Sequence, residues 1–446
     1  MSSGPAAGID GRSKLVARTE RLDVDVDLLD VAGADGVLFE RGRHGLAGVG
    51  TQGPLAEAAD ALGALGALRI DVPRSSPAEA ATAVHDALSQ IEVEDAVGAP
   101  GCGPVAIGAL PFAWAHPGSL LVPRVLVGRA EDGTRWLTTI ASADAPTGHH
   151  ERVRDRLVDA LLDGTSCDPD LVPPSSYRVT SVRPPLAWTA AVADASAALR
   201  EGAAGKVVLA RELLIEADEP LDRTAILRRL RAAYPACMLV AHGGFVAATP
   251  ELLVSRVGDI VRSHPMAGTT PRSADPTTDA RLAGALLAST KDREEHRITI
   301  DMVHDTLLPF CSYLDEEAEP SVVAMANVQH LATLVEGRLS APAASVVELM
   351  VALHPTPAVC GHPRDAALGL IAAHEQLDRG RYAGPVGWVD AGGNGEWAVG
   401  IRSAELDGRT ARLFAGVGVM PDSDPTAELA ETQAKFQALL GAILRP

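Results

Sequence analysis

Strand-like and helical segments are interleaved along this chain, but they lack the strict alternation that builds a doubly wound parallel sheet. Several short strands follow one another in segments 237–269 and 382–420, each next to a long helical stretch. Within the second segment, the sequence "DAGGNGEW" at 390–397 is typical of a tight turn that joins two antiparallel strands. The pattern therefore predicts an α+β fold in which antiparallel sheets are flanked by helices.

Composition changes near residue 165 and suggests two regions. Residues 1–165 are rich in Ala, Gly, Leu and Val, with short strand-like runs and with Ala-rich segments at 54–69 and 76–91 that predict helices. Segment 163–185 has the Pro, Ser and Asp content of a connector. We expect residues 1–165 and 166–446 to be two regions that together form one structural domain.

The overall charge limits the partners that such a chain can bind. The sequence has 58 acidic and 39 basic residues, a formal net charge of -19, which repels nucleic acid and anionic lipid. An anionic small substrate would therefore need a local cationic pocket or a metal ion. The five cysteines are scattered without CxxC spacing, and the first residues lack the apolar run of a signal peptide. We expect a cytoplasmic protein that binds neither membranes nor nucleic acid.

Two pairs of acidic residues have the spacing of one helix face. Asp292 and Glu295 are three residues apart, as are Glu428 and Glu431, and Lys435 continues the second face. Two helices that each present two carboxylates can surround Mg²⁺, which prefers oxygen ligands and retains several waters. The alternative is two unrelated solvated helix faces, which spacing alone leaves open.

A lysine and a glutamate occupy positions where a solvated charge is unexpected. Lys206 begins the apolar, β-branched run "KVVLARELLIEA", and burial there would favour the neutral amine that a general base needs. Glu251 lies between a proline and two leucines, where an apolar environment would raise its pKa and let it donate a proton. The alternatives are a lysine that reaches solvent at a strand end and an acid in a turn.

Other residues could hold a carboxylate. Gly268 and Thr269 lie between a predicted strand and a predicted helix, where backbone N–H groups and a hydroxyl can approach an anion. Arg402, Gly416 and Lys435 are further candidates for this role. Taken alone, each of these residues is more often part of an ordinary turn or surface position.

Taken together and in order, these stretches resemble the chorismate-binding enzymes, a family that includes anthranilate, aminodeoxychorismate, salicylate and isochorismate synthases. The resemblance covers roughly residues 185–440, and residues 1–165 fit the family's variable N-terminal half. It implies one large domain with the site between antiparallel sheets and helices. The matching motifs are "KVVLAR", "TPELLV", "HPMAGTTPR", "KDREEHRITIDMV", "VQHLAT", "LHPTPAVCG", "YAGPVGW", "IRSAEL", "AGVGV" and "DPTAELAETQAK".

The resemblance also implies a role for each candidate residue. It makes Lys206 the base that activates the nucleophile, and Glu251 the acid that protonates the departing C4 hydroxyl of chorismate. Mg²⁺ would be bound directly by Glu295 and Glu431 and through water by Asp292 and Glu428. The ring carboxylate would be held by Gly268, Thr269 and Lys435, and the enolpyruvyl carboxylate by Tyr382, Arg402 and Gly416.

One stretch indicates which of the family's reactions this sequence is expected to catalyse. Where aminating and salicylate-forming members have a threonine, "HPTPAVCG" has Ala358, followed by Val359, and this is similar to the isochorismate synthases. His330 matches a family site residue but does not discriminate. The resemblance thus implies a Mg²⁺-dependent isochorismate synthase that serves menaquinone or siderophore biosynthesis and needs no protein partner. The alternatives are a salicylate synthase, an aminating enzyme and a catalytically silent chorismate-binding subunit.

Overall fold

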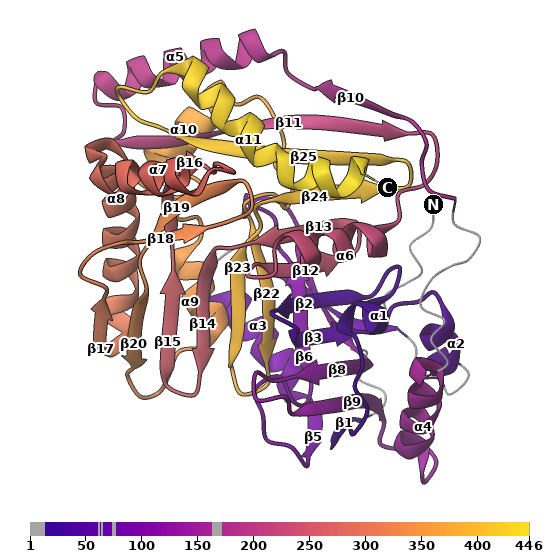
Figure 1. Cartoon of the computed structure of the whole chain (residues 1–446). Coiled ribbons are helices and arrows are strands. Elements are labelled where there is room, and N and C mark those ends of the chain that lie inside the picture. The colour runs from indigo at the N-terminus through magenta and orange to yellow at the C-terminus, as the bar shows by residue number, and fades with distance from the viewer. Residues whose placement is uncertain (1–13, 61–62, 64–65, 74–76, 163–171, 446) are drawn as a thin grey trace.

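The computed structural model describes residues 14–60, 63, 66–73, 77–162 and 172–445. Its helices lie outside the sheets, and α5, α10 and α11 cover the upper edge of the molecule in Figure 1. No helix in these ranges combines the length and hydropathy needed to cross a membrane. The helices are α1 (Leu28–Ala32), α2 (Pro54–Asp60), α3 (Pro77–Ser89), α4 (His149–Leu162), α5 (Pro185–Arg200), α6 (Arg223–Ala233), α7 (Pro276–Ala288), α8 (Thr290–Leu307), α9 (Val346–Leu353), α10 (Arg364–His374) and α11 (Pro425–Leu444), with a 3-10 turn at Leu308–Phe310.

The first sheet, here called the large sheet, has thirteen strands in the described part of the chain. Its order is β10-β11-β25-β24-β13-β12-β2-β3-β8-β9-β1-β5, with β21 paired to β11. These strands run across the page in Figure 1. They are β1 (Leu15–Arg21), β2 (Val37–Arg41), β3 (His44–Gly48), β5 (Ile91–Asp95), β8 (Val125–Arg129), β9 (Arg135–Ser142), β10 (Tyr177–Ser181), β11 (Lys206–Ala217), β12 (Met238–His242), β13 (Phe245–Thr249), β21 (Gly361–His362), β24 (Ser403–Asp407) and β25 (Thr410–Val419).

Two further sheets complete the fold. The second sheet has the order β17-β20-β15-β14-β23-β22-β6-β7-β4, and the small sheet has the order β16-β19-β18. The second-sheet strands are β4 (Ala67–Val72), β6 (Val105–Ala109), β7 (Gly118–Pro123), β14 (Leu252–Val257), β15 (Ile260–His264), β17 (Cys311–Glu316), β20 (Val335–Leu339), β22 (Pro385–Asp390) and β23 (Gly395–Val399). The small-sheet strands are β16 (Met266–Pro271), β18 (Ser321–Ala324) and β19 (Val328–Ala332).

The prediction of an α+β fold with antiparallel sheets is confirmed. Neighbouring strands are antiparallel at nearly every pairing, with β1 and β5 a parallel exception. The predicted hairpin joins β22 to β23. Strands from both sides of residue 165 enter the large and the second sheet, so the two regions share their cores. The proposed boundary itself falls within 163–171, outside the described residues.

Two secondary-structure predictions are wrong. Within the Ala-rich segment 54–69, the structure describes a helix at Pro54–Asp60, whereas residues 67–69 belong to strand β4, which pairs with β7. The connector 163–185 contains strand β10, which pairs with β11 and exposes Val179. In both cases pairing with a distant strand overrides local composition.

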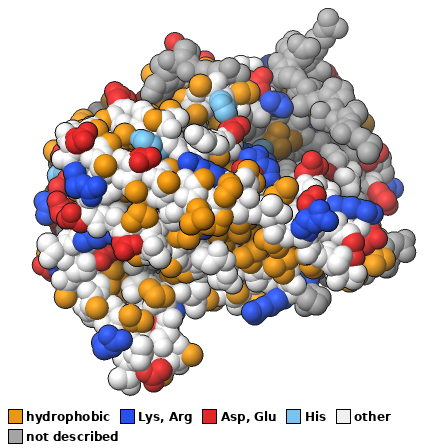
Figure 2. Space-filling view, turned by 90° about the horizontal axis from the view of Figure 1, so that it is seen from above, with side chains coloured by type: hydrophobic (Ala, Val, Ile, Leu, Met, Phe, Trp, Pro, Cys, Tyr) orange, Lys and Arg blue, Asp and Glu red, His pale blue; other side chains and the backbone are white. Residues whose placement is uncertain are grey.

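Figure 2 shows one face of the molecule from above. Acidic and basic side chains are interspersed on it, and hydrophobic side chains gather near the centre of the view.

Candidate active site

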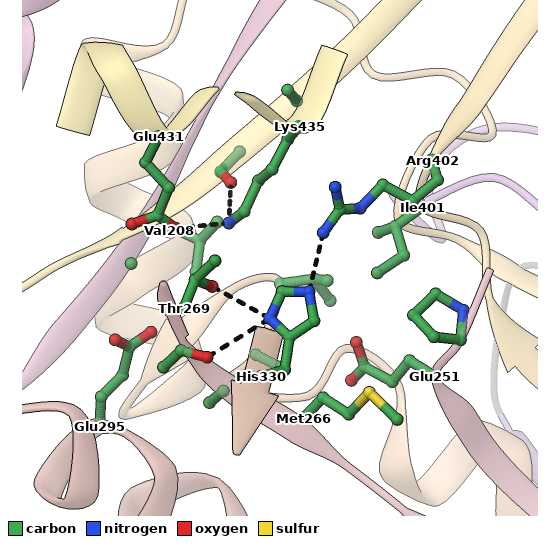
Figure 3. Close-up of a pocket in the computed structure, with 18 of the residues that line it drawn as sticks. Val208, Glu251, Met266, Thr269, Glu295, His330, Ile401, Arg402, Glu431 and Lys435 are labelled. Carbon is green, nitrogen blue, oxygen red and sulfur yellow. Dashed lines mark hydrogen bonds and ion pairs between the residues drawn. The ribbon is translucent and has the colours of Figure 1, made fainter. Parts of the chain in front are cut away.

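A pocket opens where strands β11 and β25 of the large sheet meet the small sheet and helices α8 and α11 (Figure 3). Residues from segments far apart in the sequence meet there, because the sheets bring those segments together. Most of the residues predicted from the sequence line this pocket: Glu251, Gly268, Thr269, Glu295, His330, Ala358, Val359, Tyr382, Arg402, Gly416, Glu431 and Lys435.

Three predicted residues are not in the pocket lining, but each lies near a residue that is: Lys206 near Glu295, Asp292 near Gly268, and Glu428 near Glu431. Lys206 lies next to Glu295, with 2.9 Å between Nζ and Oε1. Asp292 packs beneath Gly268, so closely that a Cβ on this glycine would lie 3.1 Å from the Cβ of Asp292. Glu428 is buried and accepts a hydrogen bond from Ser423. All the predicted site residues therefore belong to one region of the fold.

Lys206 is the first residue of β11, and its side chain is 0% exposed. At this end β11 pairs with β21 on one side, through Lys206 and His362, and with β25 on the other, so the lysine lies inside the sheet and does not reach solvent. The alternative of a lysine that snorkels to the surface is wrong. Its charge is balanced by the Glu295 carboxylate, which extends from α8 on the opposite wall.

Glu251 lies immediately before β14 and is 3% exposed. Burial raises the pKa of this carboxyl to about 8, although Lys206, Lys435 and Arg402 oppose the shift. Its Oε1 is buried without a hydrogen-bond partner in the part of the chain that the structure describes. A solvated turn acid is excluded, and a carboxyl that stays protonated at neutral pH can donate a proton.

His330 on β19 connects two walls of the pocket (Figure 3). Its Nε2 lies 2.9 Å from Arg402 Nη2, and its Nδ1 lies 3.1 Å from Thr269 Oγ1 and 3.3 Å from the carbonyl of Gly268. Because arginine can only donate, Nε2 is the acceptor and the proton is on Nδ1. Burial and Arg402 together lower the pKa of His330 well below its usual value, so the ring is neutral.

Arg402 is held in an uncommon backbone conformation with φ at 49°. Its guanidinium is buried, and burial lowers its pKa. In the described ranges no carboxylate forms an ion pair with it, and its hydrogen bond is to neutral His330. A buried, uncompensated guanidinium facing a pocket is well suited to bind an anionic ligand.

Lys435 on α11 is the second cation in the lining. Its Nζ donates a hydrogen bond of 2.8 Å to the carbonyl of Gly416 and lies 2.7 Å from Glu431 Oε1. Tyr382 stacks on Phe414 with 5.2 Å between ring centroids, and burial raises its pKa to about 12. The tyrosine therefore keeps its proton and can donate a hydrogen bond.

We call Asp292, Glu295, Glu428 and Glu431 the acidic cluster. Burial and the neighbouring carboxylates Glu295 and Glu431 raise the pKa of Asp292, and burial with Glu431 raises that of Glu428. These carboxylates thus repel one another, and a hard cation with oxygen ligands would relieve the repulsion. Among the described residues, however, no group of three His, Cys, Asp or Glu side chains is arranged so that it could hold a metal ion. The donor set fits magnesium in chemistry, and the magnesium site stays a prediction.

Gly268 and Thr269 were expected in a turn between a strand and a helix, and this expectation is wrong. Both lie within strand β16, whose pairing with β19 shifts register at Gly268. Gly268 has φ at 76°, which a residue with a side chain rarely adopts. This register shift interrupts the regular hydrogen bonding between β16 and β19 next to the pocket.

Sequence reasoning missed much of the pocket's apolar wall. Phe414 and Gly418 lie two residues on either side of Gly416 in β25, so the period of a strand could have identified both. Most of the other missed residues adjoin a predicted residue in the chain, but nothing in their apolar side chains indicates that they face the pocket. They are Val208, Pro250, Met266, Ala267, Ile401 and Ala415.

Gly418→Ala is expected to reduce turnover by at least about tenfold while the fold stays intact. A Cβ at this position would lie 2.1 Å from Glu295 Oε1 and 2.9 Å from Lys206 Cε, so the ion pair must move. Steady-state kinetics and circular dichroism measure the two effects. Gly441→Ala on α11 is the matched control, because its Cβ meets nothing within 4 Å. Equal activity of both variants would contradict the prediction.

Comparison with known proteins gives consistent matches. The model of a family described as chorismate binding enzyme matches residues 57–444. Isochorismate synthase DhbC of Bacillus subtilis is 36% identical over 351 residues, which cover 76% of this chain and 81% of that protein. Isochorismate synthase MenF of Bacillus subtilis is 38% identical over 260 residues, which cover 57% of this chain and 55% of that protein.

A solved structure shows the same fold. It is that of MenF, the menaquinone-specific isochorismate synthase of Escherichia coli, which matches with a TM-score of 0.75 over 96% of this chain and 95% of that chain. The sequence identity is 22%, so this likeness concerns the fold alone.

Proposed function

The chain belongs to the chorismate-binding enzyme family, and we propose that it is an isochorismate synthase. Chorismate would gain a hydroxyl from water at C2 and lose its C4 hydroxyl as water, so the net reaction is an isomerisation. The observation that carries the proposal is that a buried lysine, Lys206, and a buried, protonated glutamic acid, Glu251, are both found at one pocket. Glu251 and Glu295, the ion-pair partner of Lys206, lie on different sides of the pocket (Figure 3).

The two carboxylates of the substrate have separate binding groups. Thr269 accepts from His330 Nδ1–H, so its own hydroxyl proton is free to donate to the ring carboxylate, with Gly268 and Lys435 beside it. Arg402 and the Tyr382 hydroxyl face the pocket and would hold the enolpyruvyl carboxylate, next to Gly416. Cationic and donor groups at these positions would offset the acidic character of the whole protein and favour a dianion.

Magnesium is part of the proposal. Glu295 and Glu431 would hold the ion directly, and Asp292 and Glu428 would hold its water ligands, because Mg²⁺ retains several waters. When bound, the ion would supply positive charge that neutralises the ring carboxylate. Each of the four carboxylates comes from α8 or α11, so both helices contribute to the site.

The acid and the base act on different carbons of the ring. Lys206, in the neutral amine form that a base needs, would accept a proton from the water that attacks C2, and Glu251 would give its proton to the C4 hydroxyl, which leaves as water. The pKa of Glu251, about 8, keeps that proton in place at neutral pH. All these groups come from this one chain, so the proposed reaction needs no second protein.

Ala358 and Val359 distinguish the proposed reaction from further elimination of pyruvate. Both line the pocket with apolar groups, so neither offers the hydroxyl found at the first position in aminating and salicylate-forming members. We expect the ring to receive no polar contact from this wall, and the reaction to stop after water addition.

Purified protein incubated with chorismate and Mg²⁺ is expected to give isochorismate as its product, as measured by chromatography against standards. A parallel reaction with EDTA should show little conversion, because the acidic cluster would then lack its cation. Formation of salicylate and pyruvate would support the salicylate synthase alternative instead. Anthranilate or aminodeoxychorismate on addition of ammonia would support an aminating enzyme, and no product in any reaction would support a silent binding subunit.

A further inference from the structure

Lysines neutralise most of the acidic cluster. Three of its four carboxylates each pair with a lysine on the same or a neighbouring element. The pairs are Lys206 with Glu295 at 2.9 Å, Lys291 with Glu428 at 3.0 Å, and Lys435 with Glu431 at 2.7 Å. A cation that binds the cluster therefore meets lysine charges as well as carboxylates.

Lys291 differs from the other two lysines in its position. Lys206 is fully buried and Lys435 lines the pocket, whereas the side chain of Lys291 is 44% exposed and lies outside the pocket lining. Lys291 directly precedes Asp292 in the first turn of α8, and its side chain extends to Glu428 on α11. Its charge also acts on Glu295 and Asp292. Lys291 thus contributes charge to the cluster from outside the pocket lining.

The charges of the site affect the binding of a divalent cation and the binding of a dianion in opposite directions. Four carboxylates without lysines would attract a divalent cation strongly, even in the absence of substrate, and would repel a dianion. Each lysine weakens the attraction of the cation and offsets the repulsion of the dianion. A partly exposed lysine is screened by water, so its share of either effect is modest.

We propose that Lys291 balances metal binding against substrate binding. Its charge weakens the binding of Mg²⁺ to the substrate-free protein and strengthens the binding of the dianionic substrate, so that the two ligands bind together more readily than the metal alone. The inference rests on the magnesium site of the proposed function, and it adds a residue that acts through the field of the cluster rather than by contact.

Lys291→Gln is expected to bind Mg²⁺ about three- to tenfold more tightly in the absence of substrate, because one nearby positive charge is lost. Calorimetric titration of the substrate-free protein with magnesium chloride measures this affinity directly. The same variant should show a KM for chorismate raised by a similar factor at saturating Mg²⁺. Both differences should shrink at high salt, and Lys291→Arg should restore values close to those of the wild type.

Arg293→Gln is the matched control. Arg293 lies on the same helix and its loss changes the net charge equally, but its side chain pairs with Glu319 at 2.8 Å instead of with the acidic cluster. This variant should leave both affinities close to the wild-type values.

The possible outcomes separate the inference from the proposed function. If Lys291→Gln and Arg293→Gln bind Mg²⁺ equally, or if Lys291→Gln binds it more weakly, Lys291 does not compete with the metal and the inference is wrong. A weaker metal affinity would mean that Lys291 positions Glu428 for the ion. If the wild type forms isochorismate but does not bind Mg²⁺ in the titration, the magnesium site fails and the inference fails with it. A protein that binds Mg²⁺ as expected but forms another product contradicts only the assigned reaction.

Discussion

Lys206→Ala is expected to lower kcat for isochorismate formation by about 10²- to 10⁴-fold, the usual contribution of a general base. The substitution removes the amine that would accept the proton of the attacking water. The groups proposed to bind the two substrate carboxylates do not include Lys206, so Mg²⁺-dependent binding of chorismate should persist. Rapid-quench chromatography measures turnover, and calorimetry with chorismate and Mg²⁺ measures binding.

Loss of Lys206 also leaves Glu295 without its ion-pair partner, so the fold of the variant has to be verified. Thermal unfolding followed by circular dichroism serves this purpose, and exposed Lys14→Ala provides a lysine control away from the site. A folded Lys206→Ala variant with wild-type kcat would remove Lys206 from the role of base. Loss of both binding and turnover in a folded variant would indicate a role in shaping the pocket instead.

Local sequence signals predicted individual elements of this fold well. The apolar, β-branched run 206–217 is strand β11, and the helical stretch expected next to segment 382–420 is α11, which begins with Asp424 as its N-cap and Pro425 in the first turn. The long helical stretch expected next to segment 237–269 is two helices, because Ser289 ends α7 and caps α8 through its hydroxyl. Caps, prolines and periodicity act within a few residues, and so they are visible in the sequence.

The arrangement of the sheets was less accessible to sequence reasoning. β10 and β4 were not predicted because their strand character comes from pairing with β11 and β7, which local composition does not encode. Nor could the sequence show that β2 from the N-terminal region pairs with β12 from the C-terminal one. Contacts of this kind depend on long-range packing.

The candidate site likewise has features that the sequence indicated and features that depend on long-range packing. Ordered motifs indicated which residues would gather, and the structure places them around one pocket. Sequence reasoning missed a buried residue that supports the pocket wall from behind. Arg379 is fully buried, forms an ion pair with Glu375 at 2.6 Å, and donates to the carbonyls of Val359 and Val208. It therefore links one pocket wall to β11, through hydrogen bonds to backbone groups that leave no pattern in the sequence.

Glu251→Gln is expected to lower kcat by about 10²- to 10⁴-fold, because an amide of nearly the same shape cannot donate the proton that the C4 hydroxyl needs to leave. Substrate binding should change little, since the carboxyl is protonated and uncharged at neutral pH in the wild type. Single-turnover kinetics and calorimetry measure the two quantities. Thr249→Ser, which removes a methyl group but keeps the hydroxyl that accepts from the backbone N–H of Glu251, is a conservative neighbouring control and should retain most activity.

The raised pKa of Glu251 also predicts how activity and stability depend on pH. kcat/KM of the wild type should fall as the pH rises through about 8, where the acid loses its proton. The buried neutral carboxyl stabilises the fold fully below its unfolded pKa of 4.5, and this contribution is lost as the pH rises to about 8. The free energy of unfolding of the wild type should therefore fall over this range relative to Glu251→Gln, as denaturant titrations can measure. Parallel stability curves, together with an activity that continues to rise above pH 8, would show that Glu251 is ionised in the free enzyme and is not the proton donor.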